Sequence, residues 1–174
     1  AAAAYQLSVV HGIRNVVLVD DRPPLSLTSN SSTECYRNWW PGPGDAMVRL
    51  MNRSIDLLEG IARATNNRIQ LNRRGYLFTT SDPAKVDDFI KAANESAELG
   101  AGPARLHRGS AGDPTYIPAL PEGWADMPTG ADVIADPTLI RRHFPYLSAD
   151  TIAGLHARRC GWLDAQALGR YLLE

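Results

Sequence analysis

The sequence predicts an α/β fold, in which helices alternate with short strands. Residues 15–19 form a short, continuous and β-branched apolar run, as in a strand buried on both faces of a parallel sheet. Residues 45–65 place apolar side chains at helical spacing, and residues 75–80 have high β-propensity. Helix and strand patterns thus follow one another along the chain, as this class requires.

Length and composition indicate one ordinary globular domain. The chain has 174 residues, of which 44% are hydrophobic and 21% charged. The net charge is −1 and no block of Lys or Arg stands out, so we expect no nucleic-acid partner. No apolar run approaches the roughly 20 residues that a membrane-spanning helix needs, so we expect no membrane span.

The cysteines and histidines argue against a disulfide and against a metal site. Cys35 and Cys160 lie far apart in a chain with few cysteines, which favours two separate thiols over a disulfide and predicts a cytoplasmic location. The four histidines show no metal-ligand spacing, so we expect no metal site.

The first elements resemble the second half of a βαβ unit. Residues 1–11 read as a helix of small residues that stops at Gly12, and residues 15–19 follow as the buried strand. Asp20 and Asp21 close that strand. In a dinucleotide-binding unit the carboxylate at this position accepts hydrogen bonds from the ribose hydroxyls, but an aspartate there is also a common turn residue.

The middle of the chain alternates loop, helix and strand. Residues 22–44 are rich in Pro, Ser, Thr and Asn and predict a loop. Asp45 can cap the helix over residues 45–65, and residues 75–80 form a strand. Ser81 or Asp82 with Pro83 opens another helix, which ends near Gly100. The inward apolar positions of the first helix are Met47, Leu50, Met51, Ile55, Leu58 and Ile61, and those of the second are Val86, Phe89, Ile90 and Ala93.

The last third is less regular. Residues 101–132 lose periodicity and fill with Gly and Pro, which indicates an insertion or a lid. Residues 136–144 predict a short helix, and the alternation over residues 152–157 favours a strand. Residues 161–164 turn into a final helix that ends the chain.

Five features taken in order carry a resemblance to a known family. They are the run from Val16 to Asp20, the loop TSNSST from Thr28 to Thr33, Tyr36-Arg37, the helix of residues 45–65, and Gly75-Tyr76-Leu77. This succession resembles the D-amino-acid oxidase superfamily of FAD-dependent oxidoreductases, and its branch of sarcosine and dimethylglycine oxidoreductases in particular. Phe144-Pro145-Tyr146-Leu147 and Gly161-Trp162-Leu163-Asp164 are similar to two further segments of that branch. The chain resembles an N-terminal fragment that lacks the glycine motif.

The resemblance implies a partial FAD-binding, Rossmann-like region interleaved with part of an α+β substrate domain. Residues 1–71 would belong to the FAD-binding region. Residues 72–161 would belong to the substrate domain, with residues 101–132 as an insertion. Residues 162–174 would form a helix that returns to the FAD-binding region.

The resemblance also implies a cofactor site. Asp20 and Asp21 would lie at the ribose of FAD, while Thr28, Ser29, Ser32 and Thr33 would meet its pyrophosphate or ring edge through hydroxyl and backbone N–H groups. The alternative is an ordinary polar loop. Some relatives attach flavin through a histidine near this loop. Ser29 and Asn30 occupy the matching positions here, so FAD is expected to bind without a covalent link.

Arg37 is the candidate catalytic residue. It could hold a substrate carboxylate through a bidentate pair, or it could be a structural arginine bonded to loop carbonyls. Relatives can place a basic residue three positions earlier, where this chain has Glu34. Trp39 and Trp40 could wall a cavity or anchor the loop to the core.

Two functions follow as expectations. The first is oxidation of a C–N bond in an amine or amino acid, with hydride transfer to flavin. The alternative is a truncated fragment without flavin binding, acting only as a packing or assembly module. An unpaired buried-type strand invites association, so we expect an oligomer or part of a longer chain.

Overall fold

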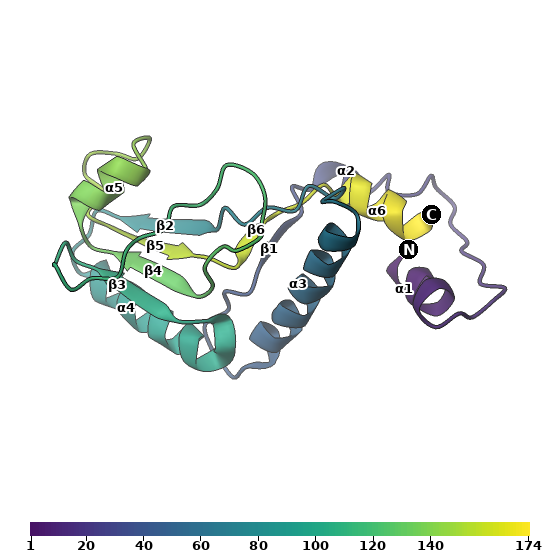
Figure 1. The fold of residues 1–174 in the computed structure, drawn as a ribbon, viewed down its shortest axis with the longest axis horizontal. Helices are drawn as coiled ribbons and strands as arrows, with labels where there is room; N and C mark the ends of the chain where they lie inside the picture. The colour runs from purple at the N-terminus through teal and green to yellow at the C-terminus, as the bar shows by residue number, and fades with distance from the viewer.

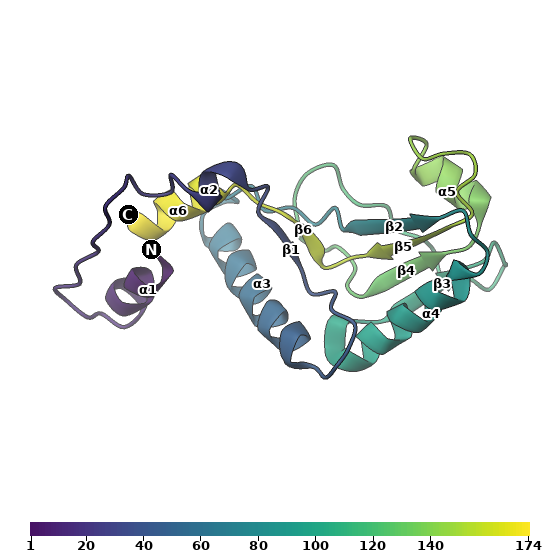
Figure 2. The same cartoon turned by 180° about the vertical axis from the view of Figure 1, so that it is seen from behind.

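The computed structural model describes residues 1–174 and shows a mixed α/β protein of elongated shape (Figure 1). A four-stranded sheet with helix α4 along one face forms one end of the molecule, and helix α3 stands beside it. The two chain termini lie together at the other end, as the reverse view also shows (Figure 2).

The sheet has strand order β2-β5-β4-β3. Its strands are β2 (Tyr76–Thr80), β3 (Ala104–His107), β4 (Ala131–Ile134) and β5 (Ala153–Ala157). β3 and β4 are parallel, and the other two pairs are antiparallel. β5 is buried along its whole length because it has a neighbour on each side and a covered surface on each face.

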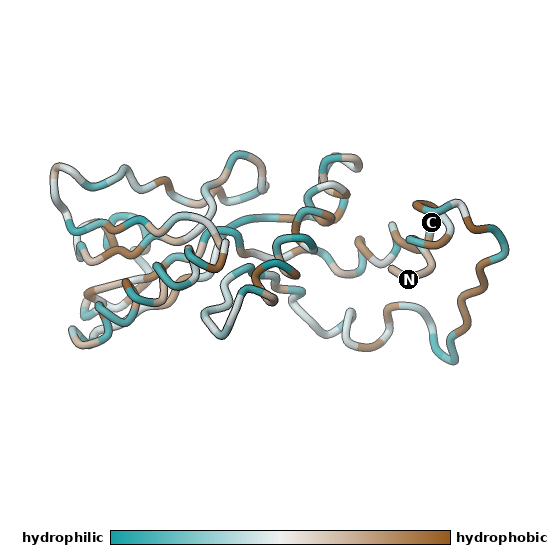
Figure 3. Tube along the Cα trace, turned by 90° about the horizontal axis from the view of Figure 1, so that it is seen from below, coloured by the Kyte–Doolittle hydropathy of each residue, from teal (hydrophilic) through white to brown (hydrophobic).

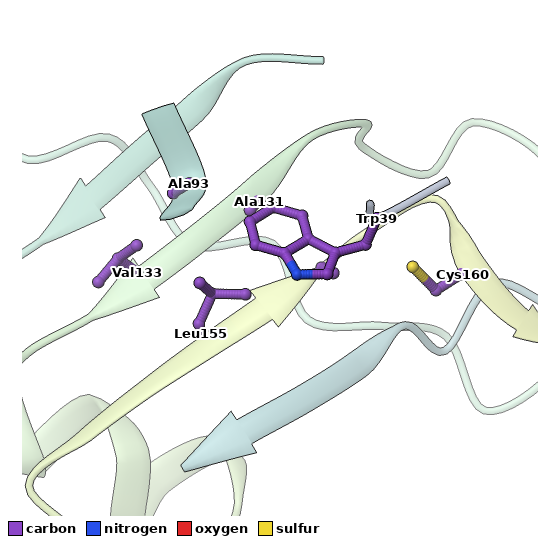
Figure 4. Packing of buried hydrophobic residues seen from close by; sticks show 7 residues of the cluster. Trp39, Ala93, Ala131, Val133, Leu155 and Cys160 are labelled. Atoms are coloured by element: carbon purple, nitrogen blue, oxygen red, sulfur yellow. The ribbon is translucent and has the colours of Figure 1, made fainter. Parts of the chain in front are cut away.

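Helix α4 (Lys85–Ser96) and the π-helical turn η2 (Ala97–Ala101) cover one face of this sheet. Figure 4 shows the core between them, in which Trp39, Val133 and Leu155 converge. Phe89 and Ile90 pack against this cluster, and Ala93 belongs to it, so three of the four predicted inward positions of the helix are confirmed. Side chains alternate along β4 and β5, and every second one therefore faces α4.

The opposite face of the sheet lies under helix α5 (Pro137–His143) and the segment 108–130. Asp136 caps α5, since its Oδ1 accepts a hydrogen bond of 2.8 Å from the Thr138 backbone N–H. Tyr116, Ile134 and Ile140 form a small apolar cluster there. This face also carries the buried ion cluster described below.

Helix α3 (Ala46–Ala64) packs near a two-stranded ribbon of β1 (Cys35–Arg37) and β6 (Cys160–Trp162). The second core joins Tyr36, Ile55 and Leu163. The apolar stripe is rotated from the predicted one, because α3 buries Val48, Ile55 and Ala62 whereas Met47 and Leu50 are exposed. Asp45 holds the N-cap position, but its side chain makes no capping hydrogen bond.

The N-terminal helix is confirmed as α1 (Ala2–Tyr5) continuing into the π-helical η1 (Gln6–Val10). Gly12 follows with a φ of +65°, the left-handed conformation expected of a glycine stop. The C-terminal helix α6 (Ala165–Leu173) lies beside it, and the Tyr5 and Tyr171 hydroxyls are hydrogen-bonded at 3.1 Å.

The strand predicted for residues 15–19 is wrong. These residues have no regular structure, and the side chains of Val17 and Val19 are 79% and 86% exposed. Figure 3 shows the hydrophobic colour along this extended segment after η1. An apolar run becomes a buried strand only between neighbouring strands, and the strands of this chain pair with one another elsewhere.

Four short elements lie in segments predicted to be loops or turns. They are α2 (Thr28–Ser31), β1, β3 and β6. Strands β2 and β5 and helices α3, α4, α5 and α6 lie where the sequence predicts them. Both cysteines are free thiols, Cys35 exposed and Cys160 buried, which confirms the prediction of two separate thiols.

Candidate functional site

A cavity of about 510 Å³ lies where the segment around α2 meets the turn between β6 and α6. Two chain segments far apart in sequence form it. Its lining consists of Ser29, Asn30, Ser32, Thr33, Cys35, Trp162, Leu163, Asp164, Ala165 and Gln166. Three of the four predicted loop residues, Ser29, Ser32 and Thr33, thus share one cavity, whereas Thr28 lies outside its lining.

Hydrogen bonds hold the two walls of this cavity together. The Gln166 side-chain amide donates to the backbone carbonyls of Leu25 and Ser29, at 2.9 and 3.2 Å. Leu25 also packs directly on Gly169 of α6, where a Cβ atom would collide with its side chain. These hydrogen bonds and this packing contact therefore hold the loop before β1 against α6. The sequence of the loop alone does not indicate that α6 is its packing partner.

The β1–β6 ribbon positions the remaining wall. Cys35 lies directly opposite Trp162 in the antiparallel register, so both side chains project from the same face. The Cys35 thiol is hydrogen-bonded to the Thr33 hydroxyl at 3.2 Å. Trp162 is 40% exposed, and the Arg74 guanidinium lies 5.0 Å from the centroid of its ring.

Arg37 lies on β1, two residues beyond Cys35 and on the same face of the strand, outside the cavity lining. Its guanidinium stacks on the Trp40 ring at 4.2 Å and lies 5.7 Å from the Tyr76 ring centroid. Burial and the nearby Cys35 raise the pKa of the Tyr76 hydroxyl above its ordinary value, although Arg37 opposes this rise. Because it is half-buried and packs against two aromatic rings, the Arg37 guanidinium can offer a pair of N–H donors in a fixed geometry to a carboxylate.

Asp20 and Asp21 are exposed and stand on the irregular segment that follows residues 15–19. Asp20 Oδ1 accepts a hydrogen bond from the Arg22 backbone N–H at 3.1 Å, and Asp21 lies 4.0 Å from the Arg22 side chain. The structure does not bring them to the cavity lining. Without a strand at residues 15–19, no sheet fixes their position.

Sequence reasoning missed a buried ion cluster around Asp132. Its carboxylate accepts hydrogen bonds from Arg105 Nε at 2.6 Å, His107 Nε2 at 2.9 Å and Arg158 Nη1 at 2.6 Å. Nearby, the Tyr116 hydroxyl lies 2.9 Å from His156 Nδ1, while His156 Nε2 donates to the Arg74 carbonyl. These residues lie on strands β3, β4 and β5, in the irregular segment 108–130 or, for Arg158, in the bend between β5 and β6, and their sequence spacing gives no signal of the cluster.

No group of three or more His, Cys, Asp or Glu side chains gathers as metal ligands would. No helix combines the length and the apolar composition that crossing a bilayer requires.

The cavity is lined by hydroxyl and amide groups and one indole, a combination of polar groups and aromatic surface that is common in small-molecule sites. Residues 1–174, the whole chain, match the family described as FAD dependent oxidoreductase. The chain belongs to this family.

A solved structure shows the same fold. The crystal structure of L-proline dehydrogenase from P. horikoshii superposes with a TM-score of 0.69 at 17% sequence identity. The match covers 98% of this chain and 37% of that protein, so this chain spans well under half of its length. A search of curated proteins found no match.

The cavity residues fit part of the cofactor that the family name implies. The hydroxyls of Ser29, Ser32 and Thr33 and the indole of Trp162 offer hydrogen bonds and a flat apolar surface, which suit a flavin. The cavity volume of about 510 Å³ is suited to one portion of FAD, a large dinucleotide.

Proposed function

We propose that this chain forms the flavin-facing loop and part of the substrate region of an FAD-dependent oxidoreductase that oxidises a C–N bond of an amine or amino acid. Two observations support the proposal. The whole chain matches the family, and three of the four predicted loop residues share a single cavity with the β6–α6 turn. The substrate named for the similar structure is L-proline, an amino acid, which supports this substrate class.

The proposed roles divide between two neighbouring groups of residues. Ser29, Ser32 and Thr33, with Thr28 beside them, hold the flavin by hydrogen bonds and without a covalent link. Arg37, held by Trp40 and Tyr76, anchors the carboxylate of an amino-acid substrate through its guanidinium. Because Cys35 and Arg37 share one face of β1, a substrate on Arg37 would lie next to the cavity.

Bound FAD would accept a hydride from the substrate carbon while the substrate nitrogen loses a proton, so that the C–N single bond becomes an imine that water hydrolyses. The residues of this chain position the substrate and the flavin. Arg37 fixes the carboxylate end of the substrate, and the aromatic rings around it limit access of water to that ion pair. Glu34, where some relatives have a basic residue, adds no second cation, so Arg37 acts alone on this side.

The wider assignments rest on the same proposal. Residues 1–71 and 162–174 belong to the FAD-binding region and residues 72–161 to the substrate domain, with residues 101–132 as an insertion. Asp20 and Asp21 stay proposed ligands of the FAD ribose. The sarcosine and dimethylglycine branch remains the proposed relationship within the family, and the two free thiols favour the cytoplasm.

Flavin binding tests the proposal directly. The purified chain is mixed with FAD, separated from free cofactor and examined for flavin absorption. We expect a yellow protein from which heating releases intact FAD, because the link is non-covalent. A colourless protein after mixing with FAD would contradict the proposal for this chain.

Arg37 has its own test. In flavin-loaded protein, sarcosine, dimethylglycine and L-proline are titrated while the flavin spectrum is recorded. We expect Arg37→Met to weaken carboxylate binding by about tenfold or more, the effect of losing a charge-assisted hydrogen bond. Arg49→Met, on the exposed side of α3, is the matched control and should bind as the parent does. Equal binding by both variants would remove Arg37 from the substrate site.

The alternative function, an assembly module without flavin, has one observation in its favour. Val17 and Val19 are among the most exposed apolar residues of the chain, on a segment with strand-like sequence. Unpaired segments of this kind associate with other strands. The assembly-module function predicts a colourless protein that self-associates. It also predicts that this association is lost when Val17 and Val19 are replaced by threonine.

A further inference from the structure

A second cavity, of about 280 Å³, lies on the face of the sheet that α5 covers, opposite α4 (Figure 1). Residues 116–121 form one wall and residues 143–146, at the end of α5, form another, while Arg74 and His156 complete the lining. This cavity shares no residue with the cavity at α2. Its volume lies just below the roughly 300–1,000 Å³ of sites for drug-sized ligands, so it suits a single ring with a short chain.

Aromatic rings form much of the surface of this cavity. The Tyr116 ring lies 4.9 Å from the His143 ring and 6.1 Å from the Phe144 ring, and Phe144 lies 6.3 Å from Tyr146. Tyr116 is buried, whereas Tyr146 is 75% exposed, so the row of rings runs from the interior to solvent. Rings at such spacings offer faces and edges against which another aromatic ring can pack.

The buried polar groups of the cavity are paired and uncharged. His156 Nε2 lies 2.8 Å from the Arg74 backbone carbonyl and therefore carries the proton, so Nδ1 accepts from the Tyr116 hydroxyl at 2.9 Å. Burial lowers the pKa of His156 to about 4, lowers the pKa of His143 and raises the pKa of Tyr116. At neutral pH these side chains thus present neutral rings to a ligand.

Arg74 supplies the one fixed charge of the lining. Its Nε donates to the Pro121 carbonyl at 2.8 Å and Nη2 donates to the same oxygen, which leaves Nη1 without a partner. The side chain is exposed, no ion pair of the chain includes it, and no Asp or Glu lines the cavity. A guanidinium with a free edge suits a carboxylate, whereas an ammonium group would meet like charge and no acceptor carboxylate.

We infer that this cavity binds a small aromatic carboxylate that lacks an ammonium group. Its ring packs against Phe144 and Tyr146, and its carboxylate pairs with the Arg74 guanidinium. The site is separate from the proposed flavin cavity and from Arg37, and the inference does not rest on flavin binding. Selectivity against amino acids follows from the charge of the lining, which favours an anion over a zwitterion.

Three matched ligands test the inference on the unaltered chain. The probe is 3-phenylpropionate; 3-phenylpropionamide removes its charge, and L-phenylalanine adds an ammonium group. We expect 3-phenylpropionate to shift the imidazole NMR signals of His143 and His156 in a saturable way and to leave exposed His11 unchanged. The other two ligands should bind about tenfold more weakly or less well still. Unmoved His143 and His156 signals, or equal affinity for all three ligands, would overturn the inference.

Two variants localise the contact. Arg74→Met should weaken 3-phenylpropionate binding about tenfold, and Tyr146→Ala should weaken it about threefold or more. Arg63→Met is the matched control, because Arg63 lies 4.9 Å from the Trp124 ring much as Arg74 lies 5.0 Å from the Trp162 ring, but outside the cavity lining. Unchanged affinity in an Arg74→Met protein that circular dichroism shows to be folded would exclude the pairing.

The outcomes separate this inference from the proposed function. Probe binding by a chain that takes up no FAD would support the inference while the proposed function fails. Arg37→Met should bind 3-phenylpropionate as the parent does. A loss of affinity in Arg37→Met equal to that in Arg74→Met, with His143 and His156 unmoved, would place the probe at the proposed substrate site and overturn the inference alone.

Discussion

Asp132 is the residue on which the buried face of the sheet depends. Its carboxylate is almost fully buried and lies within 2.6–2.9 Å of Arg105, His107 and Arg158. Burial alone would raise its pKa, but hydrogen bonds from Arg105 and His107 and the charge of Arg158 hold the pKa below its ordinary value. The carboxylate therefore stays ionised and neutralises cations that have no other carboxylate among their ion pairs.

Asp132→Asn should be strongly destabilising. It leaves Arg158, which is 1% exposed, without its counter-ion, and removing one partner of a buried ion pair costs about 3–5 kcal/mol. The free energy of unfolding in urea measures this. Asp45→Asn, which removes an exposed pair with Arg49, should change it by less than about 1 kcal/mol. Similar values for the two variants would show that the cluster is not a stabilising network.

His156 should make stability depend on pH. Burial and the nearby Arg158 lower its pKa to about 4, so the folded protein keeps it neutral while the unfolded chain, near 6.5, takes up a proton. The stabilisation is complete above about pH 6.5 and is lost as the pH falls towards 4.

The size of this effect follows from the two pKa values. From pH 7 to pH 4 the unfolding free energy should fall by roughly 3 kcal/mol more in the parent protein than in His156→Gln. Glutamine can still donate to the Arg74 carbonyl, so the variant keeps one hydrogen bond without the titration. Chemical denaturation at several pH values gives the comparison, and parallel pH curves would refute the assignment.

At the scale of elements, the β1–β6 ribbon links the two walls of the cavity. Gly161 of β6 lies opposite Tyr36 of β1, and the Tyr36 hydroxyl donates to the Asn72 carbonyl beside it. A Cβ atom at residue 161 would collide with that carbonyl. The close approach of three backbone segments therefore requires glycine at this position.

Gly161→Ala should lower the free energy of unfolding by about 1–3 kcal/mol, the range for overpacking, and should weaken FAD binding because Trp162, which lines the cavity, follows directly. Gly60→Ala provides a contrast, since residue 60 lies within α3 and a Cβ there meets nothing within 4 Å. That variant should gain roughly 0.5–1 kcal/mol. Thermal or urea unfolding measures both, and a stable Gly161→Ala protein would contradict the packing described.

These elements also show what the sequence could predict. Helices α3 and α4 and strand β2 are long enough to show a hydrophobic periodicity or a high β-propensity, and they lie where these signals predict them. Strands β1 and β6 have three residues each and owe their structure to pairing across the whole chain. The loop hydroxyls of the cavity were predicted through the family resemblance, but Trp162 and Gln166 were not predicted as site residues, because only that pairing brings them to the loop.

Across the whole molecule, burial and backbone hydrogen bonding are unevenly distributed. β4 and β5 are buried throughout and lie between helices α4 and α5, whereas residues 11–15 and 17–24 are exposed. None of the backbone N–H groups of residues 14–21 donates a hydrogen bond to a backbone carbonyl. The apolar segment 15–19 therefore gains little from the fold of this chain, and a neighbouring strand from another polypeptide would supply what it lacks.

Hydrogen exchange should reveal this gradient. In the free chain at low concentration, amides of residues 14–21 should exchange at rates near those of an unfolded peptide, and amides of β4 and β5 should exchange most slowly. Saturation with FAD should slow exchange at residues 28–35 and 162–166, which include the cavity lining. Slow exchange at residues 14–21 that appears only at high protein concentration, together with a larger sedimentation coefficient, would show pairing between copies. Slow exchange there at every concentration would contradict the exposed segment itself.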